Sequence, residues 1–587
     1  MKITSLGLSL FSVSSVVSYG VVATAQQSLS VVYPPPKHQT TSEKIFLIGT
    51  STPQGEVTVN GTEIQRSPQG HFAPSFPLEV GENTFVLRQN GTELAVTVTR
   101  VATEPDIPTE LAFVPESLFP KSDLTRLVGE TVCFSAIAPP DTEVTANLVG
   151  KRITLLPQIE SVDLPANVGV LVGENAPVAT SATGRYWGCE QFQSPGNYGT
   201  PQYTASIGVK RVTATATGNI TIARPQDLEV VEVTAENGVA RTGASTNYSR
   251  LTPLPQGTRA SVTAKEGEWL RLDYGGWIKA EETTSLPSNT PTHSLIRSIT
   301  SRQQERATEV VFPLQVAVPL SVRQQGDSIT LTLHNTTAQT DTIRLDNDPL
   351  IERLDWQQIT PDTVEYTFRL KASQQWGYDV RYEGTSLIFT LRHPPQLNSS
   401  VLPLKDIKIL LDPGHGGEEA GAKSPTGEPE KTVNLEISQL LKAELTRLGA
   451  TVYLTREEDT TLGLKERVAI IEEIQPDIAL SIHYNALPDN GDAEKTQGIS
   501  MFWYHPQAHS LAVALHDDLV TALDRPSAGV FWNNLALTRP HTAPTVLLEL
   551  GFLINPWEYE WISDRKEREK LVKAIASSVA NWVQTSN

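Results

Sequence analysis

"ILLDPGHGG", residues 409–417, is the stretch that decides the fold of the C-terminal part of the chain. An apolar run stops at Asp412, a Pro-Gly turn follows, and His415 stands between glycines. A short apolar run bounded by turn residues is typical of a buried strand. Functional side chains of open α/β sheets gather at the carboxyl ends of strands. The stretch therefore predicts a strand that presents an imidazole at the edge of a sheet.

Strand and helix patterns alternate around this stretch, from Leu404 onward. The apolar residues of "VNLEISQLLKAELTRLG" recur at helical spacing, and Gly449 ends that pattern. Further strands are predicted at "ATVYLT", "DIALSIHYN", "ISMFWY" and "PTVLLELGF", and further helices at "LKERVAIIEEI", "HSLAVALHDDLVTAL" and "DRKEREKLVKAIASSVANWV". This alternation predicts an α/β domain with a mostly parallel sheet flanked by helices.

The residues before Leu404 predict several all-β domains, because short alternating runs are broken by turns. Asn60-Gly61 and Asn90-Gly91 are hairpin signals between such runs. A chain of 587 residues is too long for one core, so several domains are expected. The predicted divisions are a signal peptide at 1–25, a β-sandwich at 29–101, a linker at 102–124, a β-rich domain at 125–224, a small barrel at 227–284, a linker at 285–306, a β domain at 307–395 and the α/β domain at 404–585.

The N-terminal segment predicts export. Lys2 precedes an apolar stretch, and Ala23-Thr24-Ala25 forms a cleavage signal. An uncleaved membrane anchor is the alternative. No other stretch approaches the ~20 apolar residues of a spanning helix, so the mature protein is predicted to lack a transmembrane segment and to be periplasmic or cell-wall associated.

The net charge limits the classes of binding partner that are expected, and the cysteine content bears on whether a disulfide forms. Acidic residues outnumber basic ones by 66 to 47, which argues against nucleic acid because phosphate binding needs basic patches. Only Cys133 and Cys189 occur. A disulfide between them is expected in an exported chain, and two buried thiols are the alternative.

Three polar residues, His415, His483 and Glu549, stand at or near the ends of apolar strands of the α/β domain, and a fourth, Glu430, stands just ahead of its long helix. His415 and His483 could each be structural, and Glu430 could merely favour the start of a helix. Glu549 lies inside the apolar run "TVLLELGF", where a carboxylate is costly unless it is paired or lies next to a metal. Two imidazoles and a carboxylate make a zinc site with an open position, and a second carboxylate nearby would be the general base.

These residues lie in motifs that resemble a known family, the zinc-dependent N-acetylmuramoyl-L-alanine amidases of bacterial cell-wall turnover. The resemblance extends from about residue 404 to 583. The motifs are Asp412 to Gly417, Glu430-Lys431 with Asn434-Leu435, Ser481-Ile482-His483 with Asn485, and "VLLELGFLIN" with Glu549 and Asn555.

The resemblance implies a role for each site residue. His415, Glu430 and His483 would bind one Zn²⁺, and Glu549 would be the catalytic carboxylate. The substrate would be peptidoglycan, cleaved at the amide between N-acetylmuramic acid and L-alanine. Arg539 matches a common family arginine and is predicted to contact substrate, with a solvated surface arginine as the alternative. An inactive wall-binding scaffold and another zinc peptidase or deacetylase are the competing functions.

Two of the β segments also resemble known modules. Residues 227–284 resemble bacterial Src-homology-three modules through Leu254 to Thr258 and Gly276-Trp277. Residues 307–395 resemble the AMIN domains that precede some cell-wall amidases. The resemblances imply binding to the wall or to a partner, such as a cell-division or envelope activator protein.

Two further features of the α/β domain qualify this interpretation. Several relatives insert a helix that blocks the zinc between the third and fourth motifs, whereas residues 486–498 here lead directly to the next strand. Self-inhibition of that kind is therefore not expected, and control of the enzyme would fall to the β domains or a partner.

His505, His509 and His516 are predicted to be surface residues rather than metal ligands.

Overall fold

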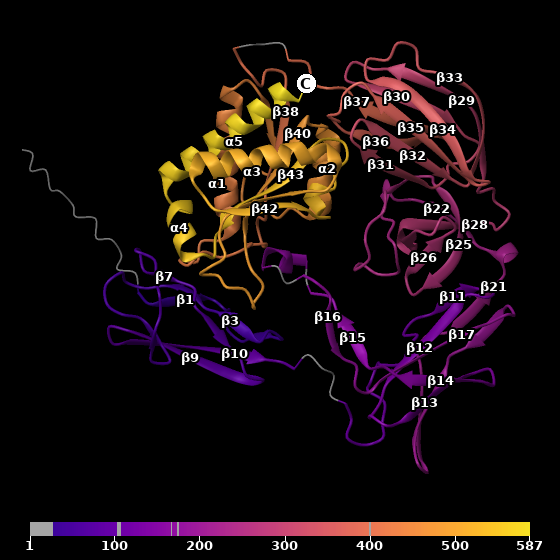
Figure 1. The fold of residues 1–587 in the computed structure, drawn as a ribbon, viewed down its shortest axis with the longest axis horizontal. Helices are drawn as coiled ribbons and strands as arrows, with labels where there is room; N and C mark the ends of the chain where they lie inside the picture. Colours follow the sequence, from indigo (N-terminus) through magenta and orange to yellow (C-terminus); the bar gives the residue numbers. More distant parts are fainter. Residues whose placement is uncertain (1–27, 103–106, 166, 173–174, 398–400, 587) are drawn as a thin grey trace, which may run out of the picture.

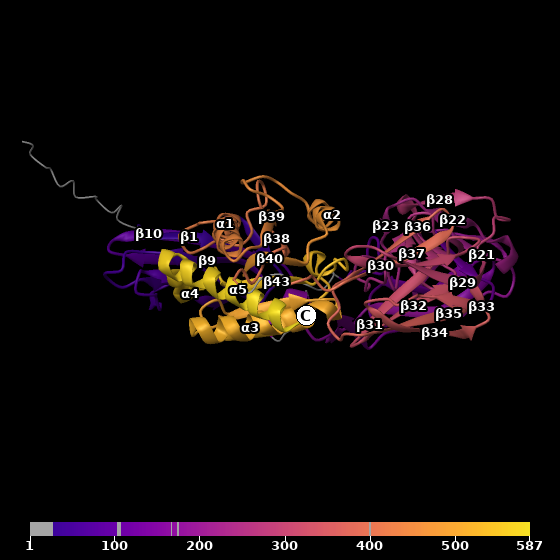
Figure 2. The same cartoon turned by 90° about the horizontal axis from the view of Figure 1, so that it is seen from above.

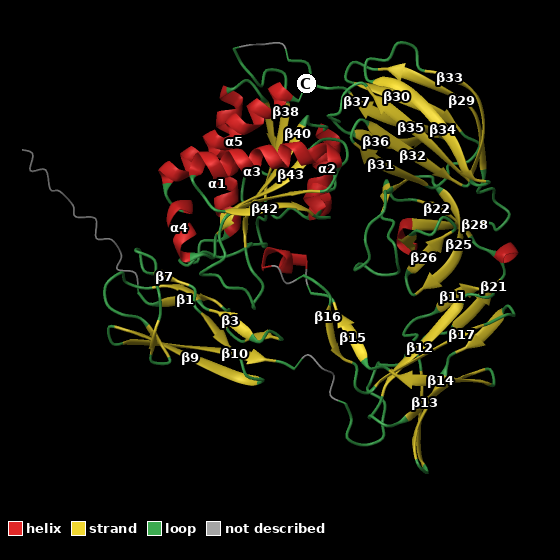
Figure 3. Cartoon of the chain, in the orientation of Figure 1, coloured by secondary structure: helices red, strands yellow, loops and turns green. Residues whose placement is uncertain are grey.

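The structure is a computed structural model, and it describes residues 28–102, 107–165, 167–172, 175–397 and 401–586. The predicted signal peptide at 1–25 lies outside the described residues. The chain is multidomain: an extensive all-β region precedes a C-terminal α/β domain (Figure 1). Figure 3 shows that the long helices lie in the C-terminal domain, and the short helical segments among the described β units are 3-10 turns. No helix among the described residues is long and apolar enough to cross a membrane.

The first β unit packs small sheets around a core that includes Phe72 and Leu87. Asn60-Gly61 and Asn90-Gly91 have positive φ angles between paired strands, so both predicted hairpins are confirmed. Its strands are β1 (Ser30–Tyr33), β2 (His38–Thr40), β3 (Lys44–Phe46), β4 (Ile48–Thr50), β5 (Thr58–Val59), β6 (Thr62–Glu63), β7 (His71–Phe72), β8 (Ser75–Pro77), β9 (Gly81–Gln89) and β10 (Thr92–Arg100).

The second β unit is a six-stranded sheet in the order β12-β17-β14-β13-β19-β20, with an additional hairpin. Cys133 and Cys189 pair directly across β12 and β17 and form a disulfide. The elements are β12 (Thr131–Ile137), β13 (Glu143–Leu148), β14 (Lys151–Pro157), β15 (Glu160–Asp163), η1 (Asn167–Val172), β16 (Val178–Ser181), β17 (Arg185–Gln191), β19 (Gln202–Ile207) and β20 (Lys210–Thr215).

A further sheet joins the second β unit to the Src-homology-three-like segment, because β11 pairs with β25. Residues 107–120 of the predicted linker at 102–124 pack Leu111, Phe113 and Leu118 on the core of the second unit. The elements are β11 (Leu124–Leu127), β18 (Gly196–Gly199), β21 (Ile220–Ala223), η2 (Pro225–Asp227), β22 (Val230–Val233), β23 (Asn237–Gly238), β24 (Leu254–Pro255), β25 (Arg259–Glu266), β26 (Trp269–Leu272), β27 (Trp277–Lys279), η3 (Ala280–Glu282) and β28 (Thr283–Leu286).

The β unit before the α/β domain is a sandwich of two sheets, β33-β29-β30-β37-β36 and β31-β32-β35-β34. The predicted linker at 285–306 is wrong in part, because β29 belongs to this sandwich. A bulge between Ile296 and Ser298 breaks the alternation, which hides the strand in the sequence. The strands are β29 (Ser294–Gln303), β30 (Ala307–Pro313), β31 (Leu320–Gln325), β32 (Ser328–His334), β33 (Thr336–Arg344), β34 (Ile351–Thr360), β35 (Thr363–Leu370), β36 (Tyr378–Glu383) and β37 (Ser386–Arg392).

The C-terminal domain contains a mostly parallel sheet in the order β39-β38-β40-β43-β41-β42, with only β41 and β43 antiparallel to each other. Helices α1, α3 and α5 cover one face, and α2 with η5 covers part of the other (Figures 1 and 2). The elements are β38 (Lys408–Pro413), α1 (Glu430–Arg447), β39 (Thr451–Leu454), α2 (Leu464–Ile474), β40 (Ile478–Asn485), β41 (Ile499–Trp503), η4 (Pro506–Ala508), α3 (His509–Leu523), β42 (Ser527–Trp532), η5 (Ala536–Thr538), β43 (Thr545–Phe552), α4 (Pro556–Ile562) and α5 (Arg565–Thr585).

The first β unit docks on the C-terminal domain, although the two are far apart in the sequence (Figure 1). Phe46 and Ile48 pack with Phe552, the last residue of β43, and with Ile554 just after it. Asp489, in the segment before β41, hydrogen-bonds Tyr33 and lies 2.9 Å from His38 Nε2. The chain therefore returns on itself, and its first unit contacts its last.

Candidate metal centre

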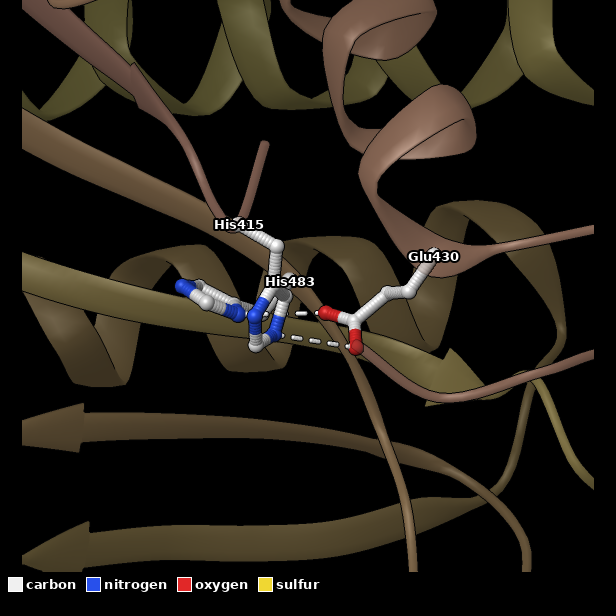
Figure 4. Close-up of side chains that lie close together, drawn as sticks. All are labelled: His415, Glu430 and His483. Carbon is white, nitrogen blue, oxygen red and sulfur yellow. Dashed lines mark hydrogen bonds and ion pairs between the residues drawn. The ribbon is translucent and has the colours of Figure 1, made fainter. Parts of the chain in front are cut away.

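Adjacent parallel strands bring three of the four predicted residues to one edge of the sheet. β40 lies between β38 and β43, so the carboxyl ends of all three strands meet there. His415 follows β38, His483 lies near the end of β40, and Glu549 of β43 is its direct register partner. Glu430, the first residue of α1, approaches from the helix that covers this edge (Figure 4).

The two imidazoles face the carboxylate of Glu430 (Figure 4). His415 Nε2 lies 3.1 Å from Glu430 Oε2, and His483 Nδ1 lies 3.1 Å from Glu430 Oε1. One ligand atom from each of the three residues lies within 4.8 Å of the others. Each oxygen of the Glu430 carboxylate thus lies beside a different imidazole ring. The ligand atoms of the three residues are close enough together to contact one shared ion.

The backbone around these side chains has no room for larger residues. A Cβ atom at Gly414 would lie 2.2 Å from His483 Cε1, and one at Gly421 would lie 2.5 Å from Glu430 Oε2. His415 itself has a φ of 58°, in the left-handed region. Non-glycine residues in that region are costly and cluster at functional sites. The loop therefore holds the imidazole of His415 in place at the cost of a strained backbone conformation at that residue.

Buried charges hold this loop to the sheet. Asp412 Oδ1 accepts from Arg467 Nη1 at 2.6 Å, and Asp412 Oδ2 accepts from Ser481 Oγ at 2.6 Å. Arg467 also donates to the carbonyl oxygens of Pro413 and His415. Arg467 is therefore a positioning residue that connects α2 to the backbone of His415.

We expect Arg467→Ala to destabilise the C-terminal domain strongly. The Arg467 and Asp412 side chains are 3% and 1% exposed, so the substitution leaves a buried carboxylate without its charged partner. Breaking such a pair costs about 3–5 kcal/mol. Calorimetric unfolding of the full chain measures the effect on the transition of this domain. Arg447→Ala, which removes an exposed partner of Glu444, is the matched control and should change stability by less than about 0.5 kcal/mol. Equal effects of the two substitutions would contradict the role assigned to Arg467.

The pKa values of the two carboxylates, Glu430 and Glu549, are shifted in opposite directions. Burial opposes ionisation of Glu430, but hydrogen bonds from His415 and His483 outweigh it and lower its pKa well below the usual range. Burial raises the pKa of Glu549 well above its ordinary value, and the negative charge of Glu430 adds to the shift. Glu430 is thereby kept ionised, whereas Glu549 favours its protonated form as long as no cation lies beside it.

The donor set fits a zinc ion. Two imidazole nitrogens and a carboxylate oxygen are ligands typical of catalytic zinc, which keeps a further position open. Glu549 Oε2 is buried beside them without a hydrogen-bond partner. An orphaned buried carboxylate oxygen is costly, and a cation with its bound water would supply the missing partner.

Arg539 is not brought to this cluster. β43 begins at Thr545, and the residues before a strand lie at its amino end, away from the edge where Glu549 lies. The carbonyl of Arg539 accepts from His505 Nε2 at 2.8 Å, and His505 follows β41, which runs antiparallel to β43. Arg539 therefore lies away from the metal cluster, and its contact with substrate stays a prediction.

The prediction that His505, His509 and His516 are surface residues is only partly correct. His509 is exposed, but His516 is 8% exposed and its Nε2 lies 2.8 Å from Ser527 Oγ. His505 is half-buried, and its ring lies against those of Tyr378 and His541. Burial lowers the pKa of His505 to about 3, with a further contribution from His541. Neither residue lies near the three-residue cluster.

Some supporting residues were not assigned a role from the sequence. Asn434 Nδ2 donates to Glu430 Oε1 at 3.0 Å, and its i+4 spacing on α1 was a usable signal. Glu419 Oε1 lies 3.1 Å from His415 Nδ1. Nothing in the sequence pattern singled out Glu419 or Arg467, because their contacts depend on how the loops fold.

Comparison with known proteins identifies relatives of the C-terminal domain. Residues 409–581 match the model of a family described as N-acetylmuramoyl-L-alanine amidase. The probable cell wall amidase LytH of Staphylococcus saprophyticus is 35% identical over 184 residues, 31% of this chain and 60% of the relative. LytH of Staphylococcus aureus is 35% identical over 179 residues, 30% of this chain and 58% of the relative. The chain thus spans about three fifths of the length of these relatives.

Among solved structures, the catalytic domain of CwlV, an N-acetylmuramoyl-L-alanine amidase from Bacillus (Paenibacillus) polymyxa, is 27% identical. The match covers 30% of this chain and 98% of that one, with a TM-score of 0.29.

Proposed function

We propose that the protein hydrolyses the amide between N-acetylmuramic acid and L-alanine in peptidoglycan, because residues 409–581 match the model of the N-acetylmuramoyl-L-alanine amidase family. A zinc ion would be held by His415, Glu430 and His483. The observation that carries the proposal is the convergence of these three side chains within 4.8 Å. Glu549, the register partner of His483, supports a hydrolytic role for the site.

A zinc ion held by His415, Glu430 and His483 would supply a Lewis acid and would lower the pKa of a bound water toward ~7. Glu549 accepts the proton of the attacking water and passes it to the amine that leaves. The oxygen of that water forms a bond to the lactyl carbonyl carbon and the C–N bond breaks. The lactyl carbonyl thereby becomes a carboxylate, and the stem peptide leaves with a free amine on L-alanine. Glu430 and the backbone carbonyl contacts of Arg467 keep the imidazoles fixed while the proton moves.

A wall substrate also supports the remaining expectations from the sequence. The protein would act outside the cytoplasm, after export directed by the predicted signal peptide. The N-terminal β units would contact the wall or an activator protein, and any control of the enzyme would come from them rather than from a helix inserted after β40.

Mass analysis of digested, purified peptidoglycan tests the proposal. We expect the full-length protein to release stem peptides that begin at L-alanine, with glycan strands left intact. Release of acetate or of cross-bridge fragments would favour another zinc hydrolase. The absence of any release with zinc present would favour the non-catalytic scaffold.

A further inference from the structure

The residues proposed to bind the metal lie on or beside two loops, and the first β unit contacts both of them. One loop, residues 414–429, carries His415 and ends at Glu430, the first residue of α1. The other, residues 486–498, follows β40, which carries His483 near its end. We call residues 414–429 the first ligand loop and residues 486–498 the second ligand loop.

An apolar cluster joins the two ligand loops to the first β unit. Leu487 and Ala493 of the second ligand loop are buried in it, and Ala422 of the first ligand loop packs against it. Buried side chains of the first β unit form the other side of the cluster: Phe46, Ile48 and Ala73. A Cβ atom at Gly427 would lie 3.5 Å from Val32 Cγ1, so β1 lies directly against the first ligand loop.

Ala422 connects this cluster to a predicted metal ligand. Its backbone N–H donates to Glu430 Oε2 at 2.9 Å, and the same oxygen lies 3.1 Å from His415 Nε2. The backbone N–H of Glu430 donates in turn to the carbonyl oxygen of Ala422 at 2.8 Å. Groups that hydrogen-bond a metal ligand orient it and tune the affinity for the metal. A displacement of Ala422 would therefore displace the carboxylate that faces His415.

Tyr33, the last residue of β1, interacts with both ligand loops. Its hydroxyl donates to Asp489 Oδ1 in the second ligand loop, and His38 Nε2 lies 2.9 Å from Asp489 Oδ2. The ring of Tyr33 stacks on that of Phe46, with 5.1 Å between centroids, and packs on the cluster that Ala422 also contacts. A hydrogen bond to an ionised carboxylate is stronger than one between neutral groups. One side chain of the first β unit thus holds two loops of the last domain.

We propose that Tyr33 is a positioning residue for the metal centre. It fixes the second ligand loop through Asp489, and it fixes the first through the apolar cluster that holds Ala422. Ligands held by rigid surroundings lose less freedom when they bind, so loosening these loops lowers the affinity for the metal. The identity of the metal as zinc rests on the proposed function.

Zinc binding by the full-length protein tests this role, with affinity measured by competition with a chromogenic chelator. We expect Tyr33→Ala to weaken zinc binding about tenfold, as the loss of a residue that supports a metal ligand does. Asp489→Ala should also weaken it. The double variant should show less than the product of the two fold-changes, because both substitutions remove the same hydrogen bond.

Glu560→Ala is the matched control, because it removes a different contact of the same interface. Glu560 Oε1 accepts from the backbone N–H of Gln69 at 2.8 Å, and Glu560 belongs to α4 rather than to either ligand loop. This variant should bind zinc as the parent does. Equal weakening by Glu560→Ala and Tyr33→Ala would overturn the proposal, since any loosening of the docked unit would then have the same effect.

Amide hydrogen exchange of the metal-free protein separates positioning from folding. We expect Tyr33→Ala to speed exchange in peptides from both ligand loops, whereas peptides from β9 and β10 should exchange as in the parent. Tyr33→Phe keeps the ring and removes only the hydroxyl, so it should speed exchange in the second ligand loop alone. Parental exchange in the second ligand loop of both variants would overturn the proposal.

These measurements need no wall substrate, so their outcome is separate from that of the proposed function. A protein whose ligand loops depend on Tyr33 but which releases no stem peptide would refute the proposed function alone. Release of stem peptides by the wild type, with zinc affinity and loop exchange unaffected by Tyr33→Ala, would refute the role of Tyr33 alone.

Discussion

Glu549→Gln is expected to lower the rate of amide hydrolysis by about 10²–10⁴-fold while zinc stays bound. Glutamine keeps the volume and polarity of the side chain but cannot carry a proton from water to the leaving amine. Glu549 is not among the three residues whose ligand atoms converge, so its loss should spare the metal. Release of stem peptides gives the rate, and elemental analysis gives the zinc content. Glu549→Ala should behave in the same way.

Glu558→Gln is the matched control for this experiment. Glu558 is another buried glutamate of the domain, and burial raises its pKa to about 7. Its carboxylate accepts from the backbone of Phe552 and Gly498 rather than facing the cluster. We expect this variant to keep activity within about threefold. Full turnover by Glu549→Gln would remove Glu549 from the mechanism, and loss of zinc would make it a ligand instead.

His483→Ala is expected to lose both zinc and activity. It removes one of three converging ligands and leaves the buried carboxylate of Glu430 without one of its two hydrogen-bonding rings. Substitution of residues that only hydrogen-bond a metal ligand weakens metal binding about 10–100-fold, so the loss of a ligand itself should weaken zinc binding by more than this. Zinc is measured after dialysis, and activity is measured before and after chelation. Added zinc should restore the chelated wild type but not the variant.

His509→Ala provides the comparison, because His509 is exposed on α3 of the same domain. This variant should retain zinc and full activity. A His483→Ala protein that still held one zinc per chain would show that the ligand set is wrong, whatever its activity.

The sequence predicted most of the C-terminal domain because its elements have strong periodic patterns. The helix at 464–474 and the strands at both histidines lie where the patterns placed them. β42 was missed because Gly529 interrupts a short polar-apolar run, and α4 because it is only seven residues long. Such short elements are fixed by packing rather than by pattern.

The convergence of His415, Glu430 and His483 could be anticipated from strand ends and motif order, and the metal they are proposed to hold stays a prediction. The place of Arg539 follows from the direction of β43, because a residue before a strand lies at its amino end, away from the carboxyl end where Glu549 is found. Its predicted contact with substrate stays a prediction. The burial of His516 depended on its contact with Ser527, which comes from a strand that the sequence did not reveal.

The docking of the first β unit affects how truncated versions of this chain should be interpreted. A fragment that starts at Leu404 loses Phe46 and Ile48, so Phe552 and Ile554 become solvent-facing. We expect such a fragment to self-associate, and adding residues 28–101 as a separate polypeptide should reverse this. A changed turnover rate of the fragment could therefore result either from exposure of Phe552 and Ile554 or from the loss of inhibition by the β domains. Adding residues 28–101 as a separate polypeptide distinguishes the two explanations.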